Sequence, residues 1–333
     1  MYFDEDGSAA KLWSMAGLGT PMAIRVAATL RVADHIADGK RTAAELAPVC
    51  DAHEGTLERL LRYLAVRGVF ARAEDGGYDL TPLSQPLRED HPARVRAWFD
   101  IDGMGWGELS FVELLHTVRT GEAAFPVRYG QPYWDDMATS PVRTASFHDL
   151  HGADMAGRSP HIVTAFDWAS LGHVTDIGGG DGSLITAILT ATPGLRGTVV
   201  DLADATAAAK ETFAEAGIDD RADAVTGSFF DPLPAGADAY LLSLILHDWP
   251  DEESVAILRR CGEAAGPDGR VLVIESIGDG EVTHTGMDLR MLCLYAARER
   301  GVTDFTALAE RAGLRRTAVY EAGPSAIIEL RAA

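Results

Sequence analysis

An alternation of apolar runs, glycine-rich turns and helix-forming segments begins near Trp168 and constrains the fold more than any other feature. Apolar runs bounded by glycine are typical of buried strands, and their alternation with helical segments predicts a parallel sheet covered by helices. The chain closes with two strand-like runs, LRRTAVYEA and SAIIELRA, joined by Gly323 and Pro324. We expect this last pair to form an antiparallel edge of the sheet.

The segment HVTDIGGGDG, residues 173–182, joins an apolar strand to a helix that opens near Ser183. Glycine permits positive φ and close approach of a ligand, and the helix N-terminus offers free N–H donors. Dinucleotides and S-adenosylmethionine both occupy such turns. The dinucleotide pattern would begin at Gly178 and place its third glycine at Ser183, and Asp176 would lie close to the pyrophosphate. NAD is therefore disfavoured.

Asp201 ends the next apolar run, GTVVD, where its carboxylate is placed to accept both hydroxyl groups of a ribose. This acidic residue occurs with both cofactor classes, so it predicts a ribose without choosing between them. A glycine-rich turn alone often marks only a tight turn of the backbone. Its combination with Asp201 favours a ligand site.

A histidine, His247, stands at the carboxyl end of another buried run, in LLSLILHDW. Ligands of open parallel sheets bind beyond the carboxyl ends of the strands, so His247 and Asp248 are expected to face the cofactor. Most histidines are surface or core residues, but this position favours catalysis. A phenol, with a pKa of ~10, needs a base to become a nucleophile, and an imidazole that titrates near ~6.5 can accept its proton.

A catalytic imidazole needs a partner that fixes its tautomer, and two carboxylates are candidates. Glu275 ends the run RVLVIE, and its position favours it. Glu299 lies between Arg298 and Arg300 in a turn that has the composition of an exposed one. A solvated carboxylate is therefore the safer interpretation of Glu299, although an orienting role stays open.

Residues 93–165 lack the glycine and proline spacing of strands and carry many aromatic side chains, which predicts a helical connector. Aromatic residues usually pack in a core, yet between two domains they could equally line an apolar pocket. For such a substrate pocket we select Trp106, Phe111 and Trp134. We add Met287, Met291 and Tyr295, which recur on one predicted helix face where both interpretations again stay open.

The N-terminal part of the chain predicts a winged helix. Residues 20–37 are rich in small and aliphatic residues, which predicts a largely buried helix suited to a subunit interface. Thr42 and Glu45 form a capping-box pattern before a further helix pair, and Asp-Gly-Gly at residues 75–77 predicts a β-hairpin. A winged helix serves either dimerisation or DNA binding.

Charge helps to choose between these roles. Asp and Glu number 50 against 29 Lys and Arg, which gives a net charge of −21 at pH 7. Such a surface repels nucleic acid and anionic lipid, so a homodimer through the N-terminal helices is favoured over DNA contact, and no membrane partner is expected. The acidic N-terminus lacks the pattern of a signal peptide, and no uncharged apolar run reaches ~20 residues, so we expect a cytoplasmic protein. Three separated cysteines fit neither a disulfide framework nor a metal site.

Several motifs together resemble a known family. VTDIGGGDG, GTVVDL, GSFFD, LILHDWPDE and VLVIES follow one another as in the small-molecule S-adenosylmethionine-dependent O-methyltransferases with a winged-helix dimerisation domain. TPMAIRVAATLRVADHI, FPVRYG, GSFFDPLPAGA and HTGMDLRML resemble, more narrowly, the naphthoate and polyketide-tailoring enzymes of antibiotic biosynthesis. The resemblance extends over essentially the whole chain.

The resemblance implies an α/β fold with three segments. A mainly α-helical winged-helix dimerisation domain would occupy residues 1–92, and a helical connector lining the substrate pocket would occupy residues 93–165. Residues 166–333 would form a class I Rossmann-like methyltransferase domain, with a mostly parallel seven-stranded sheet and an antiparallel edge hairpin.

The same resemblance implies site residues. His247 would be the general base, Glu275 and Glu299 its orienting carboxylates, and Asp248 a substrate contact. The cofactor contacts, with their neighbours in each motif, would be Asp176, Gly178, Gly180, Asp201, Leu202, Ser228, Phe229, Phe230 and Ser243. Many members have Asp where Ser228 stands, and plant members have Lys where Ser243 stands, which puts the adenine-side geometry in doubt.

The implied reaction is in-line methyl transfer from S-adenosylmethionine to a hydroxyl of a small aromatic acceptor, for which a hydroxy-naphthoate or related polyketide is the first candidate. Lys11 or Arg25 could meet an acceptor carboxylate. Three alternatives remain: a methyltransferase-fold enzyme that hydroxylates or decarboxylates a polyketide, a DNA-binding regulator, and a nicotinamide dehydrogenase.

Overall fold

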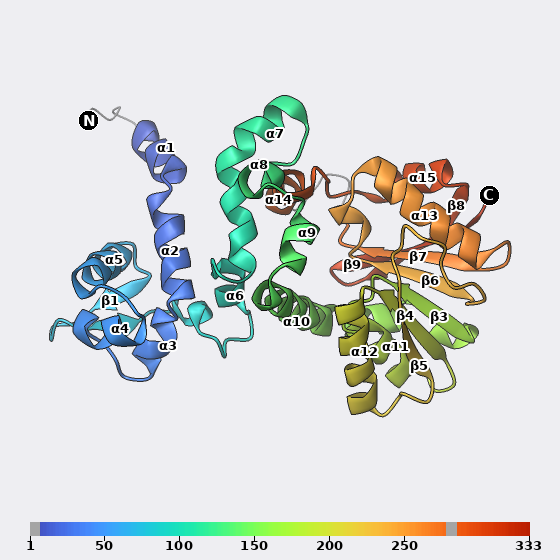
Figure 1. Ribbon diagram of the computed structural model, residues 1–333, viewed down its shortest axis with the longest axis horizontal. Helices are drawn as coiled ribbons and strands as arrows, with labels where there is room; N and C mark the ends of the chain where they lie inside the picture. Colours follow the sequence, from blue (N-terminus) through green and yellow to red (C-terminus); the bar gives the residue numbers. More distant parts are fainter. Residues whose placement is uncertain (1–6, 278–284) are drawn as a thin grey trace. The chain divides into compact units, whose positions relative to one another are not determined.

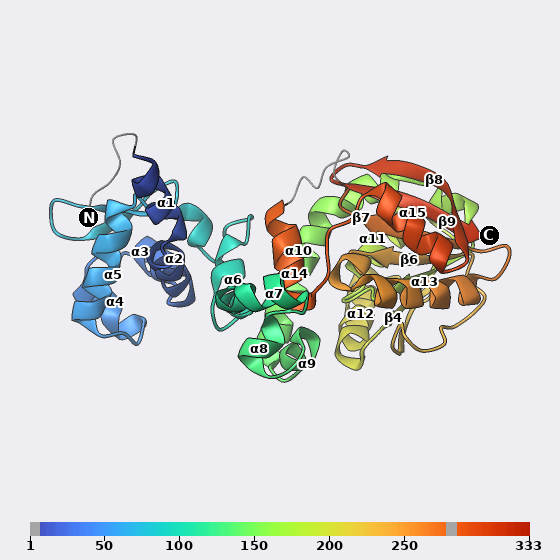
Figure 2. The same ribbon diagram turned by 90° about the horizontal axis from the view of Figure 1, so that it is seen from above.

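The computed structural model describes residues 7–277 and 285–333 and divides into two compact units (Figure 1 and Figure 2). Unit 1 contains the chain up to Trp106 together with Ser140–Leu150, and unit 2 contains Gly107–Thr139 together with His151–Ala333. The acidic residues 1–6 and His284 of the stretch HTGMDLRML lie outside the described residues. The division of the chain into three segments stays a prediction.

Unit 1 is mainly helical with one small hairpin. Its elements are α1 (Ser8–Ala16), α2 (Gly19–Thr29), α3 (Val32–Ala37), α4 (Ala43–Val49), α5 (Glu54–Val66), β1 (Phe70–Arg72), β2 (Tyr78–Leu80) and α6 (Val95–Phe99). The strands β1 and β2 pair antiparallel around the predicted turn, and Thr42 and Glu45 form the predicted capping box of α4. These contacts confirm the winged-helix pattern.

The single helix predicted over residues 20–37 is wrong. The chain forms α2 and α3 instead, and Arg31 between them adopts a left-handed conformation with φ 53°. The hydroxyl of Thr29, the last residue of α2, accepts a hydrogen bond from the backbone N–H of Ile101 at 2.8 Å. The periodic spacing of apolar residues does not reveal this break, because the break is linked to contacts with residues far away in the sequence.

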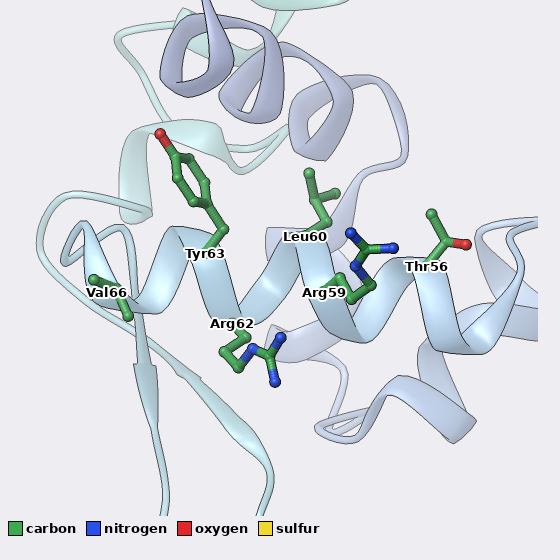
Figure 3. A pocket seen from close by; sticks show the side chains of 6 residues that line it. All are labelled: Thr56, Arg59, Leu60, Arg62, Tyr63 and Val66. Carbon is green, nitrogen blue, oxygen red and sulfur yellow. The ribbon is translucent and has the colours of Figure 1, made fainter. Parts of the chain in front are cut away.

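The outward face of α5 carries a shallow groove, which Figure 3 shows. Its lining residues are Thr56, Arg59, Leu60, Arg62, Tyr63 and Val66. The opposite face of the helix packs Leu57, Leu61 and Leu64 into the core of unit 1. The helix is therefore amphipathic, as the leucine spacing indicates.

Unit 2 is built on a seven-stranded sheet in the order β5-β4-β3-β6-β7-β9-β8. Its strands are β3 (His173–Ile177), β4 (Arg196–Asp201), β5 (Ala222–Thr226), β6 (Ala239–Ser243), β7 (Arg270–Glu275), β8 (Leu314–Ala322) and β9 (Ser325–Ala332). The first five are parallel, whereas β9 pairs antiparallel with both β7 and β8. The predicted class I Rossmann-like sheet with its antiparallel edge pair is confirmed.

Helices cover both faces of this sheet. α11 (Ser183–Ala191), α12 (Ala203–Ala216) and the end of α10 (Pro141–Ala165) pack on one face, and α13 (Asp251–Ala265) and α15 (Val302–Arg311) pack on the other. Unit 2 also contains α7 (Leu114–Thr120), α8 (Phe125–Tyr129), α9 (Tyr133–Ala138) and α14 (Thr285–Tyr295). Along β7, Leu272 and Ile274 pack in the cluster with α11 and α12, while Val271 and Val273 pack in the cluster with α13 and α15. Burial on both faces explains why the strands read as continuous apolar runs.

Candidate active site

The glycine turn after β3 is shaped by close packing at two positions and open at a third. Gly178, Gly180 and Gly182 all have positive φ, at 72°, 58° and 74°. A Cβ on Gly178 would lie 2.5 Å from Cδ1 of Ile245, and one on Gly182 would lie 2.6 Å from the ring of Phe213. A Cβ on Gly180 would meet no heavy atom within 4 Å. The turn therefore has open space above its middle glycine, where a ligand could contact the backbone.

Asp176 is a buried carboxylate near the end of β3, with 1% of its surface exposed. Among the described residues, neither of its carboxylate oxygens has a hydrogen-bond partner. Burial, reinforced by the charges of Asp201 and Asp181, raises the pKa of Asp176 to about 7. A buried acceptor without a donor is costly, so this side chain fits a site that a ligand completes.

Asp201, at the end of β4, is held in place by backbone donors. Its Oδ2 accepts a hydrogen bond from the N–H of Gly180 at 2.8 Å, and its Oδ1 accepts one from Leu202 at 2.6 Å. The carboxylate therefore joins the glycine turn to the end of the neighbouring strand. The structure brings these predicted cofactor residues together with Asp176 and Gly178.

The other predicted cofactor residues lie on the loop after β5 and at the end of β6. The hydroxyl of Ser228 accepts a hydrogen bond from Phe230 N–H at 3.2 Å. The rings of Phe229 and Phe230 pack edge-on against Trp249, with centroids 5.6 and 4.9 Å away. The hydroxyl of Ser243 is buried and has no partner in the described part of the chain. Ser243 and Asp176 thus leave unsatisfied polar atoms on neighbouring strands.

The chain turns sharply between β6 and the histidine. Leu244 has φ 54°, which is uncommon for a residue with a branched side chain, and its N–H donates to the carbonyl of Ile274 at 2.9 Å. A short 3-10 helix, η4 (Leu246–Asp248), follows. It places His247 beyond the carboxyl end of β6. Backbone strain of this kind is concentrated at functional sites.

The imidazole of His247 contacts two carboxylates. Its Nδ1 lies 3.2 Å from Oε1 of Glu299, within hydrogen-bond distance, and its Nε2 lies 3.5 Å from Oδ1 of Asp248. Glu275 instead accepts a hydrogen bond from the backbone N–H of Leu246 at 3.0 Å. The carboxylate bonded to the ring is thus Glu299, whereas the position of Glu275 in the sequence favoured it for that contact.

The interpretation of Glu299 as a solvated carboxylate is wrong. Only 7% of Glu299 is exposed, and its backbone N–H donates to Asp288 at 2.9 Å. The flanking Arg300 is also buried, while Arg298 is exposed. A run of charged residues has the composition of a surface turn, and sequence alone does not reveal that two of its members are paired in the interior.

Electrostatics around His247 favour a protonated ring. Burial opposes the charge on His247, but Asp248, Glu275 and Glu299 outweigh it and raise the pKa of the imidazole to about 10. Burial raises the pKa of Asp248 to about 6 and that of Glu275 to about 7, although the charge of His247 acts against both shifts. A further positive charge beside the ring would lower the pKa of His247.

Two of the predicted substrate residues meet in an aromatic cluster of unit 2. The rings of Trp134 and Tyr295 stack with centroids 5.6 Å apart and an interplanar angle of 12°. Tyr133 packs edge-on against both, with centroids 5.2 and 4.9 Å away. Burial, Tyr133 and the charge of Asp248 raise the pKa of Tyr295, which places this cluster within electrostatic reach of the acidic site.

The remaining substrate candidates differ in their surroundings. Met291 is buried in α14, Met287 is exposed near its start, and Phe111 is partly buried. Trp106 belongs to unit 1, where the guanidinium of Arg143 lies 4.8 Å from its ring centroid.

The two cations suggested for an acceptor carboxylate also lie in unit 1. Lys11 is exposed on α1. Arg25 lies over the ring of Phe99, 5.2 Å from its centroid. Their role stays a prediction.

Sequence reasoning missed the side chains that hold η4. Arg300 and Ser254 both donate hydrogen bonds to carbonyl oxygens of this turn. The sequence signal for Arg300 is that it directly follows Glu299, in a charged run that has the composition of a surface turn.

Within residues 7–277 and 285–333, no three His, Cys, Asp or Glu side chains are grouped so that they could hold a metal ion. In the same part of the chain, no helix is both long and apolar enough to cross a membrane.

Comparisons with known proteins agree with this geometry. A family model described as the O-methyltransferase domain matches residues 111–315, and one described as the O-methyltransferase dimerisation domain matches residues 13–90. The chain is 50% identical over 322 residues to 2,7-dihydroxy-5-methyl-1-naphthoate 7-O-methyltransferase of Streptomyces carzinostaticus, covering 96% of this chain and 97% of the relative.

A solved structure and a second relative extend the comparison. The crystal structure of the O-methyltransferase NcsB1 from neocarzinostatin biosynthesis, in complex with S-adenosylmethionine and 2-hydroxy-5-methyl naphthoic acid, has a TM-score of 0.93 at 50% identity and covers 97% of this chain and 98% of its own. The chain is also 42% identical over 313 residues to aclacinomycin 10-hydroxylase RdmB of Streptomyces purpurascens, covering 91% and 83% of the two proteins.

Proposed function

We propose, from the premise that this chain belongs to the S-adenosylmethionine-dependent O-methyltransferases with an N-terminal dimerisation domain, that its acceptor is a hydroxy-naphthoic acid or a related polyketide aromatic. The observation that carries the proposal is the pairing of His247 with Glu299 at the sheet edge that also bears the glycine turn. A base and a nucleoside-binding turn at the same edge of the sheet suit the transfer of a methyl group from a bound cofactor to an oxygen nucleophile.

The residues at the glycine turn fit S-adenosylmethionine. This cofactor supplies a methyl group on positively charged sulfur, and its methionine portion carries an ammonium group. The unpartnered carboxylate of Asp176 suits that ammonium group. Asp201 would hold the ribose, and the rings of Phe229 and Phe230 offer apolar surfaces for adenine. Ser243 and Ser228 would add hydroxyl contacts, and these roles belong to the proposal.

His247 would act as the general base. A hydrogen bond from its Nδ1–H to Glu299 leaves Nε2 as the atom that takes the acceptor proton. Because carboxylates hold the pKa of His247 at about 10, proton abstraction at neutral pH requires a positive charge near the ring, and the bound cofactor carries one. The carboxylate of Asp248 lies 3.5 Å from Nε2 and would repel a deprotonated acceptor beside that atom. The acceptor hydroxyl would therefore bind in its neutral form.

The acceptor class is inferred from the aromatic cluster and from the relatives. Trp134, Tyr295 and Tyr133 provide flat apolar surfaces of the kind that receive fused rings. The relative that is 50% identical is named for a dihydroxy-naphthoate. A hydroxylated bicyclic acid therefore suits both the pocket chemistry and the family.

The test is a methyl-transfer assay with isotope-labelled S-adenosylmethionine. The acceptors would be hydroxy-naphthoic acids and matched naphthoic acids without the hydroxyl. We expect label on the hydroxylated acceptors alone. Failure to label any of them, with S-adenosylhomocysteine still bound by the protein, would defeat the proposed acceptor class.

Hydroxylation is the second candidate function, because one relative at 42% identity is named a hydroxylase. The same assay, run also with isotope-labelled oxygen, separates the two reactions. Incorporation of labelled oxygen without labelled methyl would support hydroxylation, and we expect labelled methyl. We also expect no sequence-specific DNA binding at moderate salt. Such binding would favour a DNA-binding regulator instead.

A homodimer is part of the proposal. Leu12, Trp13, Met15 and Leu18 are between 64% and 74% exposed, and α1 buries none of its residues. An apolar surface of this kind at the start of a dimerisation domain favours contact with a second copy. Sedimentation should show a dimer, and Leu12→Ser with Trp13→Ser should yield the 35.6 kDa monomer. A cytoplasmic location, consistent with three free buried cysteines, also belongs to the proposal.

A further inference from the structure

Arg300 lies between α14 and α15, and its side chain has no exposure to solvent. Its Nη1 donates to the carbonyl oxygen of Leu246 at 2.6 Å, and its Nη2 donates to that of Trp249 at 2.8 Å. Nη2 also lies 2.7 Å from Oδ1 of Asp251, at the start of α13. One guanidinium thus joins the start of a helix to two peptide groups of the turn that carries His247.

These two carbonyls flank the histidine. Leu246 directly precedes His247, and Trp249 follows it by two residues. The N–H of Leu246 is held by Glu275, and Ser254 donates to the same two carbonyls as Arg300, at 3.3 and 3.1 Å. Side chains from β7, α13 and the segment before α15 therefore fix the backbone of η4 together.

The neighbour of Arg300 is the carboxylate that contacts the ring. Glu299 lies 3.2 Å from Nδ1 of His247, while Arg300 holds the peptides on either side of that residue. Two consecutive residues thus bind the imidazole and its backbone from one segment. Release of the guanidinium contacts would free the base to move relative to its partner.

We propose that Arg300 is a positioning residue that keeps His247 in register with Glu299 during the methyl transfer proposed above, on which this inference rests. A buried guanidinium is retained only where acceptors satisfy its donors, and here all its acceptors lie on the catalytic turn or at the start of the helix that follows it. Lysine keeps the charge but presents a compact ammonium group in place of a planar fork, so it cannot reach all three acceptors in the same geometry.

The test compares Arg300→Lys with Arg298→Ala. Arg298 is the matched control, because it pairs with the same Asp251 at 3.3 Å but lies at the surface. We expect Arg300→Lys to lower kcat about 10²-fold, as a displaced catalytic group does, with the KM of either substrate changed by less than about threefold. Arg298→Ala should leave kcat within about twofold of the wild-type value.

A proton resonance separates positioning from a general loss of stability. The Nδ1 proton of His247, hydrogen-bonded to Glu299, should give a downfield signal that disappears in His247→Asn, which assigns it. Arg300→Lys should shift or broaden this signal in folded protein. A kcat within about threefold of wild type, or an unchanged signal, would overturn the proposal.

Two further measurements keep the test decisive. If Arg300→Lys does not fold, Asp251→Asn removes the charge that anchors Arg300, and we expect it to lower kcat about tenfold and to shift the same signal. An unchanged signal in that variant would also overturn the proposal. A wild-type protein without methyl transfer would defeat the proposed function instead, and the resonance would still test whether Arg300 holds the turn.

Discussion

Buried acidic groups lie at the end of β3 and around the turn that follows β6, but only those around the turn have partners within the described protein. At β3, Asp176 is buried and, among the described residues, neither carboxylate oxygen has a partner. Beyond β6, the buried carboxylate of Glu299 lies against His247, and Arg300 and Glu275 hold the backbone of the turn. The same sheet edge thus joins an unsatisfied site to a satisfied one.

The difference indicates how the two halves of the site are prepared. The His247 side is held by contacts within the protein, so we expect its geometry to serve catalysis without reorganisation. At the end of β3, burial favours the neutral form of the Asp176 carboxyl group until a cation approaches, as its pKa of about 7 indicates. We expect changes at the first side to affect kcat and changes at the second to affect cofactor affinity.

Replacement of His247 tests the organised side most strongly. His247→Asn should lower kcat by ~10²–10⁴-fold, because the acceptor hydroxyl loses its base. Steady-state kinetics with saturating S-adenosylmethionine would measure this loss. Cofactor affinity should change little, and a variant that transfers methyl at the wild-type rate would remove His247 from the mechanism.

Two isosteric substitutions compare the carboxylates around the ring. Glu299→Gln should lower kcat by about 10- to 100-fold, since the imidazole loses its charged partner. Glu275→Gln should have a smaller effect, because its amide oxygen can still accept from the N–H of Leu246. Measured kcat values in the reverse order would indicate that Glu275 is the carboxylate that serves the base.

Asp176→Asn tests the unsatisfied side. An amide cannot pair with an ammonium as a carboxylate does, so the Kd of S-adenosylmethionine should rise about 10- to 100-fold. The kcat at saturating cofactor should fall much less. Titration calorimetry and steady-state kinetics separate these effects, and a variant with lowered kcat but unchanged Kd would contradict the contrast between the two sides.

The unsatisfied side also predicts a pH dependence of stability in the ligand-free protein. Because the pKa of Asp176 is raised from 3.8 to about 7 in the fold, its contribution to stability is full below about pH 4 and is lost as pH rises through 7. Asp176→Asn should therefore become progressively more stable than wild type over this interval, by up to about 1.4 kcal/mol per pKa unit. Urea unfolding at several pH values measures the difference, and parallel curves for the two proteins would refute it.

The sequence predicted the sheet and its turns but not the contacts made between distant segments. Apolar runs, glycines and helix caps are local signals, so the strands from β3 to β9 and the capping box at Thr42 could be found without coordinates. The break at Arg31 could not, because it accompanies a contact between Thr29 and the backbone of Ile101. Tertiary contacts of this kind override local periodicity.

The site shows the same limit. The position of His247 and Asp201 at the carboxyl edge of the sheet could be predicted, because the end of a strand is a position that sequence reveals. Composition favoured a solvated Glu299 and a surface Arg300, since a run of charges has one composition whether it is solvated or buried against partners. Only the family resemblance pointed to Glu299 as an orienting carboxylate. The burial of both residues depends on groups that lie about fifty residues earlier in the chain. The ring of His247 contacts Glu299, and the carbonyl of Leu246 accepts a hydrogen bond from Arg300.

The contacts of Arg300 and Glu275 with η4 go to peptide groups, which every amino acid carries. The side chains that we predict to surround the acceptor, such as Trp134 and Met287, take no part in them. Evolution can therefore exchange the walls of the acceptor pocket while the base keeps its place. Libraries that randomise those walls and retain the main-chain anchors should yield new acceptor preferences at little loss of turnover.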